Sequence, residues 1–463
     1  MDFSWVDAFS KLIIIILKSA INTNKNEMLQ KILQGVILVL TKNHAQQREN
    51  FNQRPFFRLF YNLLYDFRRK EYNFGQQEVY QFLFIFARVF DTIQPLKYPG
   101  FAFAWLELVS NRNFMPVILS NTQKKSDSWT SYCRLLINLF QFFQETFPTD
   151  QYKTDFYKNF YKGTLRALVV MLHDFPEFLI ESSFLLVESI PEKFTQIRNI
   201  IFSAFPKSIQ PPDPFRVSES IEKKDEFREV PEVLYKFDQR VTSIGLHEEI
   251  AKFIMIKDTV NDKYFRSICS KLLSKDGNDE ITINYKVVNS FVLYIPTLIY
   301  KGIEESKIPE LKQNSFELFW KLLVSSNYQM RQALLNAIMN QIRYPNQITS
   351  YFTSLIFHIF TNHNDENLQE QIIKIYIDRL IVDRPHPWGI MYSFIELLKD
   401  RDIYKKKQFF KDSEFEEILK YVFGSMGKPN PGAGGGQGPA GGNQPQQPGP
   451  NINAYGGKNT PPQ

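Results

Sequence analysis

The sequence predicts an all-α fold, built as an irregular HEAT-like α-solenoid of antiparallel helix pairs. Apolar residues recur every three or four positions through most of the chain, which is the spacing of one helix face. Residues 1–426 hold only nine of the 20 Gly, the residue that most often interrupts helices. The links between apolar stripes are short and contain Pro, Asn, Asp or Ser, so consecutive helices are expected to run antiparallel. Each pair then leaves an apolar stripe that only its neighbour can cover.

The N-terminal half, residues 1–205, opens with an apolar stripe at Val6, Phe9, Ile13, Ile16 and Ala20. The run within this stripe, LIIIIL, is only six residues long, whereas a membrane-spanning helix needs roughly 20 apolar residues. We therefore expect a packed helix here and no membrane span in the chain. Further helices are expected at residues 29–40, 56–67, 79–93, 101–109, 132–143, 160–172 and 196–205.

The C-terminal half, residues 233–424, repeats this pattern. Residues 281–287 (ITINYKV) alternate as a strand would, but seven residues without a partner strand are weak evidence for a sheet. We therefore expect a loop that runs into a helix at 287–299. Other helices are expected at residues 233–237, 247–256, 316–323, 331–342, 351–360, 368–380, 388–398 and 415–422.

Two breaks in composition divide the chain. Residues 206–232 contain five Pro among residues of mixed charge, which predicts a linker or a long loop between the two halves. Residues 425–463 are rich in Gly, Pro and Gln, and such a segment buries too little apolar area to order itself. The predicted domains are therefore 1–205, the linker 206–232, 233–424 and a disordered tail at 425–463.

The composition excludes several classes of protein. The 43 Phe and 22 Tyr are too many large rings for a disordered chain. The two cysteines, Cys133 and Cys269, cannot build a disulfide framework or a zinc site by themselves. The N-terminus has neither the basic region nor the cleavage site of a signal peptide, so we expect an intracellular protein.

The sequence contains no pattern that is typical of an enzyme. His358 and His363 are five residues apart, which predicts different faces of a helix and argues against a shared metal. The string 173–177 (HDFPE) is expected at a helix end, where a His favours the negative dipole; a hydrolase would need it in a deep polar pocket. A GxGxxG string at 436–441 lacks the flanking strand and helix of a phosphate site. We expect no enzymatic activity, no cofactor and no metal.

Basic residues cluster at 68–70 (RRK) and again at Lys399, Arg401 and 405–407. Acidic residues are interleaved with both clusters, so the opposite charges partly cancel and a solvated surface is the default interpretation. Direct RNA binding by a helical-repeat protein is the alternative function. It would require a continuous basic groove with exposed aromatics, and we do not expect direct nucleic-acid binding.

The most unusual string is 383–389 (DRPHPWG). Its two prolines fix their own φ and restrict the preceding residues to extended conformations. Trp388 then begins an apolar stripe. We interpret the string as a rigid turn that anchors Trp388 between helical layers, with a lip for a partner peptide as the alternative, since both use the large area of an indole ring.

Several strings, in order along the chain, carry a family resemblance. They are 99–101 (PGF), 104–108 (AWLEL), 161–166 (YKGTLR), 173–178 (HDFPEF), 203–206 (SAFP), 212–215 (PDPF), 340–346 (NQIRYPN) and 384–389 (RPHPWG). Together they resemble the C-terminal domain of the Not-one scaffold, the large subunit of the Ccr–Not mRNA deadenylase complex. The resemblance covers residues 1 to about 424.

The resemblance implies a HEAT-like, non-catalytic docking platform that supports mRNA deadenylation and translational repression. Its implied partners are the NOT-box subunits of the complex and short linear motifs of Nanos-like translational repressors. It also implies a cytoplasmic protein that can associate with P-bodies and have a nuclear pool. Family scaffolds are much longer, and the segments that hold the deadenylases and the helicase have no counterpart here. The resemblance therefore implies NOT-module docking by this chain rather than deadenylase recruitment.

We expect partner contacts in the C-terminal half, around residues 285–400. Aromatic and Arg side chains contribute most to binding where they fill grooves between helices. The candidate partner-binding residues are Phe319, Arg343, Tyr344, Tyr351, Phe352, Arg384 and Trp388.

Overall fold

The computed structural model describes most of the chain in a single compact unit, Met1–Lys428. The described residues are 3–20, 23–120, 125–146, 154–215, 229–256, 262–275, 277, 279–301 and 304–399, with residues 417, 419, 420 and 424. The predicted tail, residues 216–228 of the predicted linker and most of the predicted helix at 415–422 lie outside the described residues. No helix in the described part is both long enough and apolar enough to cross a membrane.

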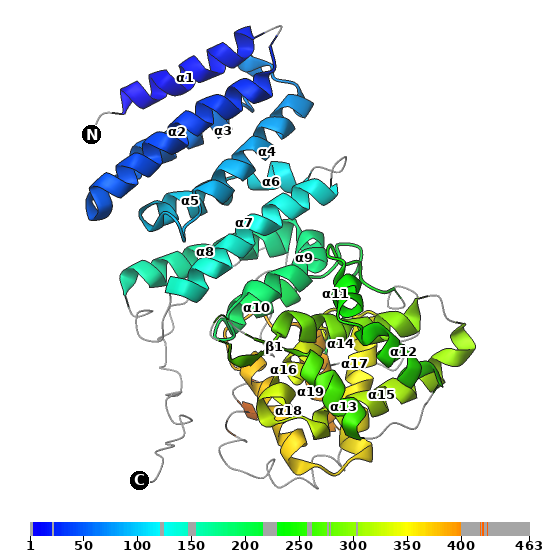
Figure 1. Cartoon of the computed structure of the whole chain (residues 1–463). Helices are drawn as coiled ribbons and strands as arrows, with labels where there is room; N and C mark the ends of the chain where they lie inside the picture. The colour runs from blue at the N-terminus through cyan, green and yellow to red at the C-terminus, as the bar shows by residue number, and fades with distance from the viewer. Residues whose placement is uncertain are drawn as a thin grey trace, which may run out of the picture. The chain divides into compact units, whose positions relative to one another are not determined.

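The regular secondary structure of the described residues is helical apart from one small sheet, which confirms the predicted all-α solenoid of helix pairs (Figure 1). In the N-terminal half, α1 packs on α3, α2 on α4, α4 on α7, and α7 on α9. The helices are α1 (Ser4–Ser19), α2 (Lys25–Gln47), α3 (Arg54–Asp66), α4 (Gln76–Thr92), α5 (Ala102–Val109), α6 (Met115–Leu119), α7 (Lys125–Thr146), α8 (Asp155–Asp174), α9 (Pro176–Ser189) and α10 (Thr195–Phe202).

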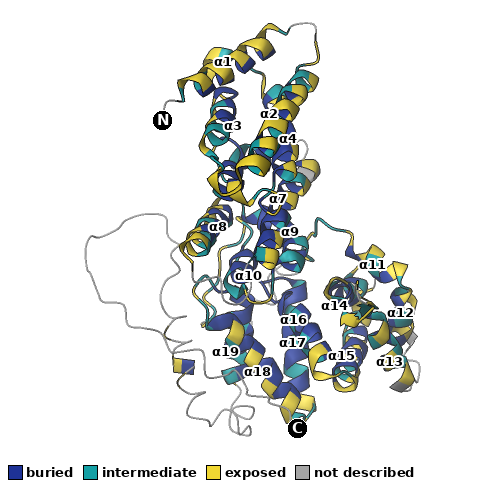
Figure 2. Cartoon of the chain, turned by 60° about the vertical axis from the view of Figure 1, so that its left-hand side comes forward, coloured by how far each residue is buried: buried dark blue, intermediate teal, exposed yellow. Residues whose placement is uncertain are grey.

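In the C-terminal half, α14 packs on α11 and α16, α15 packs on α12 and α13, and α18 packs on α16 and α19. Helices α16 and α17 are buried along most of their length (Figure 2). The helices are α11 (Phe237–Ser243), α12 (Leu246–Ile256), α13 (Asp262–Lys271), α14 (Tyr285–Tyr300), α15 (Ile308–Ser325), α16 (Tyr328–Met339), α17 (Gln347–Asn362), α18 (Glu366–Leu380) and α19 (Trp388–Lys399).

Two local predictions are wrong. Residues 281–283 form a strand, β2 (Ile281–Ile283), because a partner strand that the sequence did not reveal, β1 (Leu273–Lys275), pairs with it antiparallel. The predicted helix at 233–237 is also absent, since α11 begins only at Phe237. The Leu234 amide instead donates to the Glu181 carbonyl oxygen of α9 at 2.9 Å, which holds this segment against the N-terminal half.

Apolar side chains gather into two cores. One core extends from Val6 to Ala204 and includes Tyr344 from the other half of the chain. The second extends from Phe237 to Leu419 and includes Phe184 from α9. Each half therefore contributes a ring to the core of the other, and the predicted boundary at 206–232 stays a prediction.

Short polar side chains fix where several helices begin. The Asn24 side-chain oxygen accepts from the backbone amides of Asn26 and Glu27 at the start of α2. The Asn346 side chain does the same for the first turn of α17. Such caps satisfy amides that have no partner inside the helix, and each contributes about 1 kcal/mol.

The turn between α16 and α17, residues 340–346, is held by side chains that come from the next helix. The Arg343 amide donates to Thr349 Oγ1 at 3.1 Å, and Thr349 Oγ1 donates to the Tyr344 carbonyl at 2.8 Å. Asn346 donates from its side chain to the same carbonyl at 2.7 Å. This turn is buried, and its backbone groups are therefore satisfied within the fold.

Two buried arginines connect this turn region to the N-terminal half. The Arg343 guanidinium donates to Ser183 Oγ and to the Ile180 carbonyl, both on α9. At the second arginine the N-terminal half is the donor: the side-chain amide of Asn199 on α10 donates to the Arg379 carbonyl oxygen at 2.6 Å. Burial lowers the pKa of Arg343, because desolvation disfavours the charged form, and lowers that of Arg379 to about 9.

The string 384–389 packs at the same contact between the two halves of the chain, which we call the junction. Trp388 donates from its ring nitrogen to the Pro212 carbonyl at 2.7 Å, and its ring lies edge-on to Phe205 with centroids 6.4 Å apart. Gly389 donates its amide to the Arg343 carbonyl oxygen. Trp388 is thus an internal anchor between layers, which is the first of the two interpretations drawn from the sequence.

Replacing Gly389 with Ala should destabilise the protein. An added Cβ would lie 2.9 Å from Arg343 N and Ile342 C, and closer still to the Arg343 carbonyl, so backbone would have to move. We expect Gly389→Ala to lower the free energy of unfolding by about 1–3 kcal/mol. Urea unfolding followed by circular dichroism measures this loss.

Gly35→Ala is the matched control, because Gly35 lies within α2 and an added Cβ there meets nothing within 4 Å. Replacing a helical Gly with Ala should stabilise by about 0.5–1 kcal/mol. If Gly389→Ala unfolds at the same urea concentration as the unaltered chain, the close approach at the junction is refuted.

The buried His386 should make stability depend on pH. Burial, with a smaller effect of the Arg384 charge, lowers the pKa of His386 from 6.5 to about 4, and neither ring nitrogen has a hydrogen-bond partner among the described residues. Between pH 4 and pH 6.5 the unfolded chain binds more protons at His386 than the folded chain does. The free energy that the neutral, buried His386 contributes to stability is therefore complete above pH 6.5 and is lost as the pH falls toward 4. We expect the unaltered chain to lose about 2 kcal/mol more than His386→Gln between pH 7 and pH 5. Equal losses in urea unfolding would contradict this.

Candidate partner-docking groove

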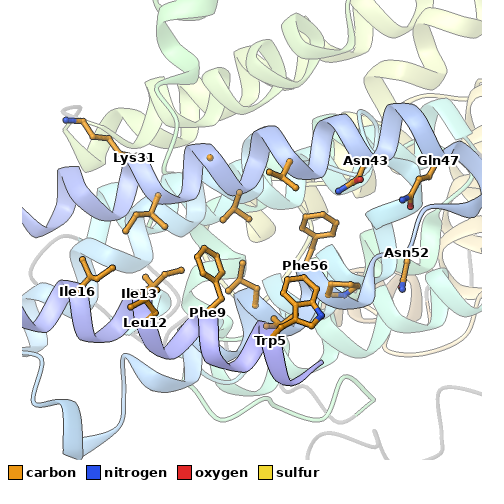
Figure 3. Close-up of a pocket in the computed structure, with 17 residues that line it drawn as sticks. Trp5, Phe9, Leu12, Ile13, Ile16, Lys31, Asn43, Gln47, Asn52 and Phe56 are labelled. Atoms are coloured by element: carbon orange, nitrogen blue, oxygen red, sulfur yellow. The ribbon is translucent and has the colours of Figure 1, made fainter. Parts of the chain in front are cut away.

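An apolar groove of about 710 Å³ lies between α1, α2 and the start of α3 (Figure 3). We call it the α1–α3 groove. One wall comes from α1 and the opposite wall from α2, and Phe56 points between them. The lining residues are Trp5, Val6, Phe9, Leu12, Ile13, Ile16, Lys31, Ile32, Gly35, Val36, Val39, Asn43, Gln47, Asn52, Pro55, Phe56 and Leu59.

The groove exposes large apolar side chains that the fold leaves uncovered. Trp5 is 62% exposed, Leu12 is 51% exposed and Val39 is 53% exposed. Single exposed apolar residues are ordinary on a protein surface, but a contiguous apolar hollow is typical of a binding site.

The groove exists because α1 is apolar on two sides. Val6, Ile13 and Leu17 are fully buried, and α1 packs mainly on α3. A second stripe at Trp5, Phe9, Leu12 and Ile16 steps by three and four along the same helix and faces the groove. One neighbouring helix can cover only one such stripe, so the second stays open.

The electrostatics of the α1–α3 groove favour an uncharged, apolar ligand. Lys31 is the one charged residue of the lining, and its ammonium pairs with Glu27 at 2.7 Å on an exposed face of α2. Asn43, Gln47 and Asn52 add amide groups at one end. Such a groove can hold apolar anchors of an extended or helical peptide while the amides bond to its backbone. Its lining holds no carboxylate, histidine or cysteine that could act as an acid, base or nucleophile.

Three of the predicted partner-binding residues lie in the C-terminal core. Phe319, Tyr351 and Phe352 have no exposed area in the described structure. Phe319 and Phe352 pack edge-on with ring centroids 6.0 Å apart, and Tyr351 shares a 2.6 Å hydrogen bond with Ser315. Burial raises the pKa of the Tyr351 hydroxyl.

The other four lie at the junction of the halves. Arg343, Tyr344 and Trp388 are buried there, and the Phe205 ring contacts both Tyr344 and Trp388. Arg384 is half-buried. None of the seven lines the α1–α3 groove, and their contact with a partner stays a prediction, while the structure gives six of them packing roles within the chain.

The clusters of titratable residues noted in the sequence do not form a catalytic or metal site among the described residues. His173 Nδ1 lies 2.7 Å from Asp174 Oδ1, but both side chains are exposed at the end of α8. The predicted placement of His358 and His363 on different faces of one helix is wrong, because α17 ends at Asn362 and the two rings lie 5.5 Å apart. Among the described residues, no three His, Cys, Asp or Glu could share a metal ion.

The apolar spacing in α1 did not predict the α1–α3 groove. It placed Phe9 and Ile16 on the same inward stripe as Val6 and Ile13, whereas in the structure Val6 and Ile13 are buried and Phe9 and Ile16 are exposed in the groove. The signal that could have revealed the groove is the number of apolar positions in α1, which exceeds what one helix face can bury.

The chain is similar in sequence to a described protein family and to a known yeast protein. Residues 64–423 match the family described as CCR4-Not complex component, Not1. General negative regulator of transcription subunit 1 of Saccharomyces cerevisiae is 29% identical over 87% of this chain, which spans only 20% of that relative.

Two solved structures share the fold. The NOT1 superfamily homology domain of Chaetomium thermophilum matches with a TM-score of 0.81 and 26% identity, over 91% of this chain and 83% of that one. A Not1 C-terminal domain in complex with Not4 matches with a TM-score of 0.77 and 27% identity, over 91% of this chain and 86% of that one. From the helical fold and the extent of the family match, the chain belongs to the Not1 family of CCR4-Not complex components.

Proposed function

We propose that the chain is a non-catalytic docking platform of the Ccr–Not complex, and that the α1–α3 groove is one of its docking sites. The observation that carries this proposal is the open second stripe of α1, which forms an apolar hollow on an otherwise well-packed helical array. Membership of the Not1 family supports the role in the complex.

The proposed ligand of the groove is a short linear motif of a translational repressor, Nanos-like in type, with two or three apolar anchors. A motif of this kind binds by placing aromatic or aliphatic side chains between helices. Trp5 and Phe56 can stack against such anchors, and Asn43, Gln47 and Asn52 can bond to the peptide backbone. Binding of the motif would bring the repressed mRNA to the complex, in support of deadenylation.

The second proposed class of partner is the NOT-box subunits. A structural relative of this chain has been solved with Not4, and its fold covers 91% of this chain. We propose that this chain binds a Not4-type subunit through the fold that it shares with that relative. We also propose that the protein acts in the cytoplasm with a nuclear pool.

A single carboxylate in the groove should separate groove binding from general surface effects. Val39 lines the groove and is 53% exposed, whereas Leu38, its neighbour on α2, is 69% exposed and does not line it. We expect Val39→Glu to weaken binding of a fluorescent Nanos-type repressor peptide about tenfold, because a buried, unpaired charge is unfavourable. Leu38→Glu should change affinity less than about twofold. Fluorescence anisotropy measures both, and equal losses would exclude the groove as the site.

Complex formation tests the scaffold role separately. We expect the purified chain to co-elute with a Not4-type subunit in size-exclusion chromatography at micromolar concentration, and Val39→Glu to leave this co-elution unchanged. Separate elution of the two proteins would refute the NOT-module assignment without bearing on the groove.

A further inference from the structure

A second hollow, of about 650 Å³, is lined by residues from the end of α3, the start of α4 and α6. Helices α4 and α6 pack beside each other (Figure 1). We call this hollow the α3–α6 pocket. Its lining differs from that of the α1–α3 groove because it combines basic and apolar side chains. The lining residues are Phe67, Arg68, Arg69, Lys70, Asn73, Phe74, Gln76, Val79, Tyr80, Pro116, Val117 and Ser120.

The pocket has an excess of positive charge. Arg68, Arg69 and Lys70 line it, and no carboxylate does. Arg69 is neutralised, since it lies 2.8 Å from Glu71 and 3.8 Å from the buried Asp66. The other two cations lack such carboxylate partners, so the rim carries about two uncompensated charges.

Lys70 and Arg68 differ in the contacts that their charged groups make. The Lys70 ammonium makes no hydrogen bond or ion pair with another described residue and is exposed. Arg68 donates to two neutral oxygens, the Arg112 carbonyl at 3.3 Å and the Asn113 side chain at 3.4 Å. Neutral acceptors orient a guanidinium but leave its charge available to an anion.

Below this rim the pocket is apolar and already formed. Phe67 and Val79 are buried at its floor, and Phe74 packs edge-on against Phe67 with centroids 5.8 Å apart. The backbone at Asn73 has a φ of 50°, a left-handed conformation that Asn tolerates, and this turn brings the chain from the rim back to the pocket wall. No rearrangement is needed before a ligand could enter.

We infer that the α3–α6 pocket binds an acidic peptide segment that carries one aromatic or aliphatic anchor. The anchor would enter between Phe74 and Val117, and acidic residues beside it would meet Lys70 and Arg68. This is charge complementarity at a site of limited size, which favours specificity for one sign of ligand. The inference does not depend on the ligand of the α1–α3 groove.

A peptide fits the pocket better than RNA does. Nucleic acid is recognised by a stripe of cations that follows many phosphates. Here the three cations are consecutive in sequence and line one hollow of limited size, not an extended stripe. An anchor-shaped apolar floor also has no counterpart in backbone recognition of RNA.

The test uses a fluorescein-labelled peptide of alternating Asp and Gly residues around a single central Trp, titrated with the full chain. Lys70→Glu is the test variant, because Lys70 is exposed and makes no described contact that folding requires. Lys42→Glu is the control, since it makes the same charge change at an exposed position of α2 that lines neither hollow. Circular dichroism confirms that both variants are folded.

We expect Lys70→Glu to weaken peptide binding about fivefold or more and Lys42→Glu to leave it within about twofold. Replacing the peptide Trp with Ala should weaken binding to the unaltered chain by a similar factor. Undetectable binding, equal loss in the two variants, or binding that ignores the Trp would each overturn the inference. Tighter binding of a labelled oligouridine of equal length, with the same sensitivity at Lys70, would overturn it in favour of RNA.

Discussion

The buried turn at residues 340–346 is the constraint on which the rest of this structure depends. Its Arg343 reaches α9 through the side chain, Thr349 of α17 through the backbone amide and Gly389 through the backbone carbonyl, so one residue contacts three separate segments. Arg343, Arg379 and Arg198 are all buried near this junction without a described ion pair. Their guanidinium hydrogen bonds go to carbonyl, hydroxyl and amide oxygens, while Nε of Arg198 and of Arg343 has no partner among the described residues. Neutral acceptors avoid the desolvation of a second charge.

This arrangement separates the residues that hold the two halves together from the apolar residues that the fold leaves open on its surface. The strings that resemble the Not-one scaffold, above all 203–206, 212–215, 340–346 and 384–389, meet at the junction and pack on one another. The open apolar surface lies instead on α1 and α2, in the N-terminal half. A rigid junction would fix the relative placement of separate docking surfaces, which is what a scaffold requires of its fold.

Much of the fold could be predicted from the sequence, because apolar spacing is a local property and most helices here are amphipathic. Helix α9 was missed because Phe178, Leu179 and Ile180 are all buried, so its sides show no contrast. The strand at 281–283 depends on a partner that local pattern does not reveal. The candidate groove was harder to predict. Large aromatics such as Tyr351 suit a core as well as a groove, and the packed structure shows which apolar positions of α1 its neighbours leave uncovered.

Hydrogen–deuterium exchange with and without a bound Nanos-type repressor peptide locates the ligand on the chain. If a rigid, non-catalytic helical array receives its ligand in the α1–α3 groove, amide exchange in α1 and α2 should slow on binding. Exchange in the 340–346 turn should be slow already and remain unchanged. Protection confined to residues 340–389, with none in α1 and α2, would contradict binding in the groove.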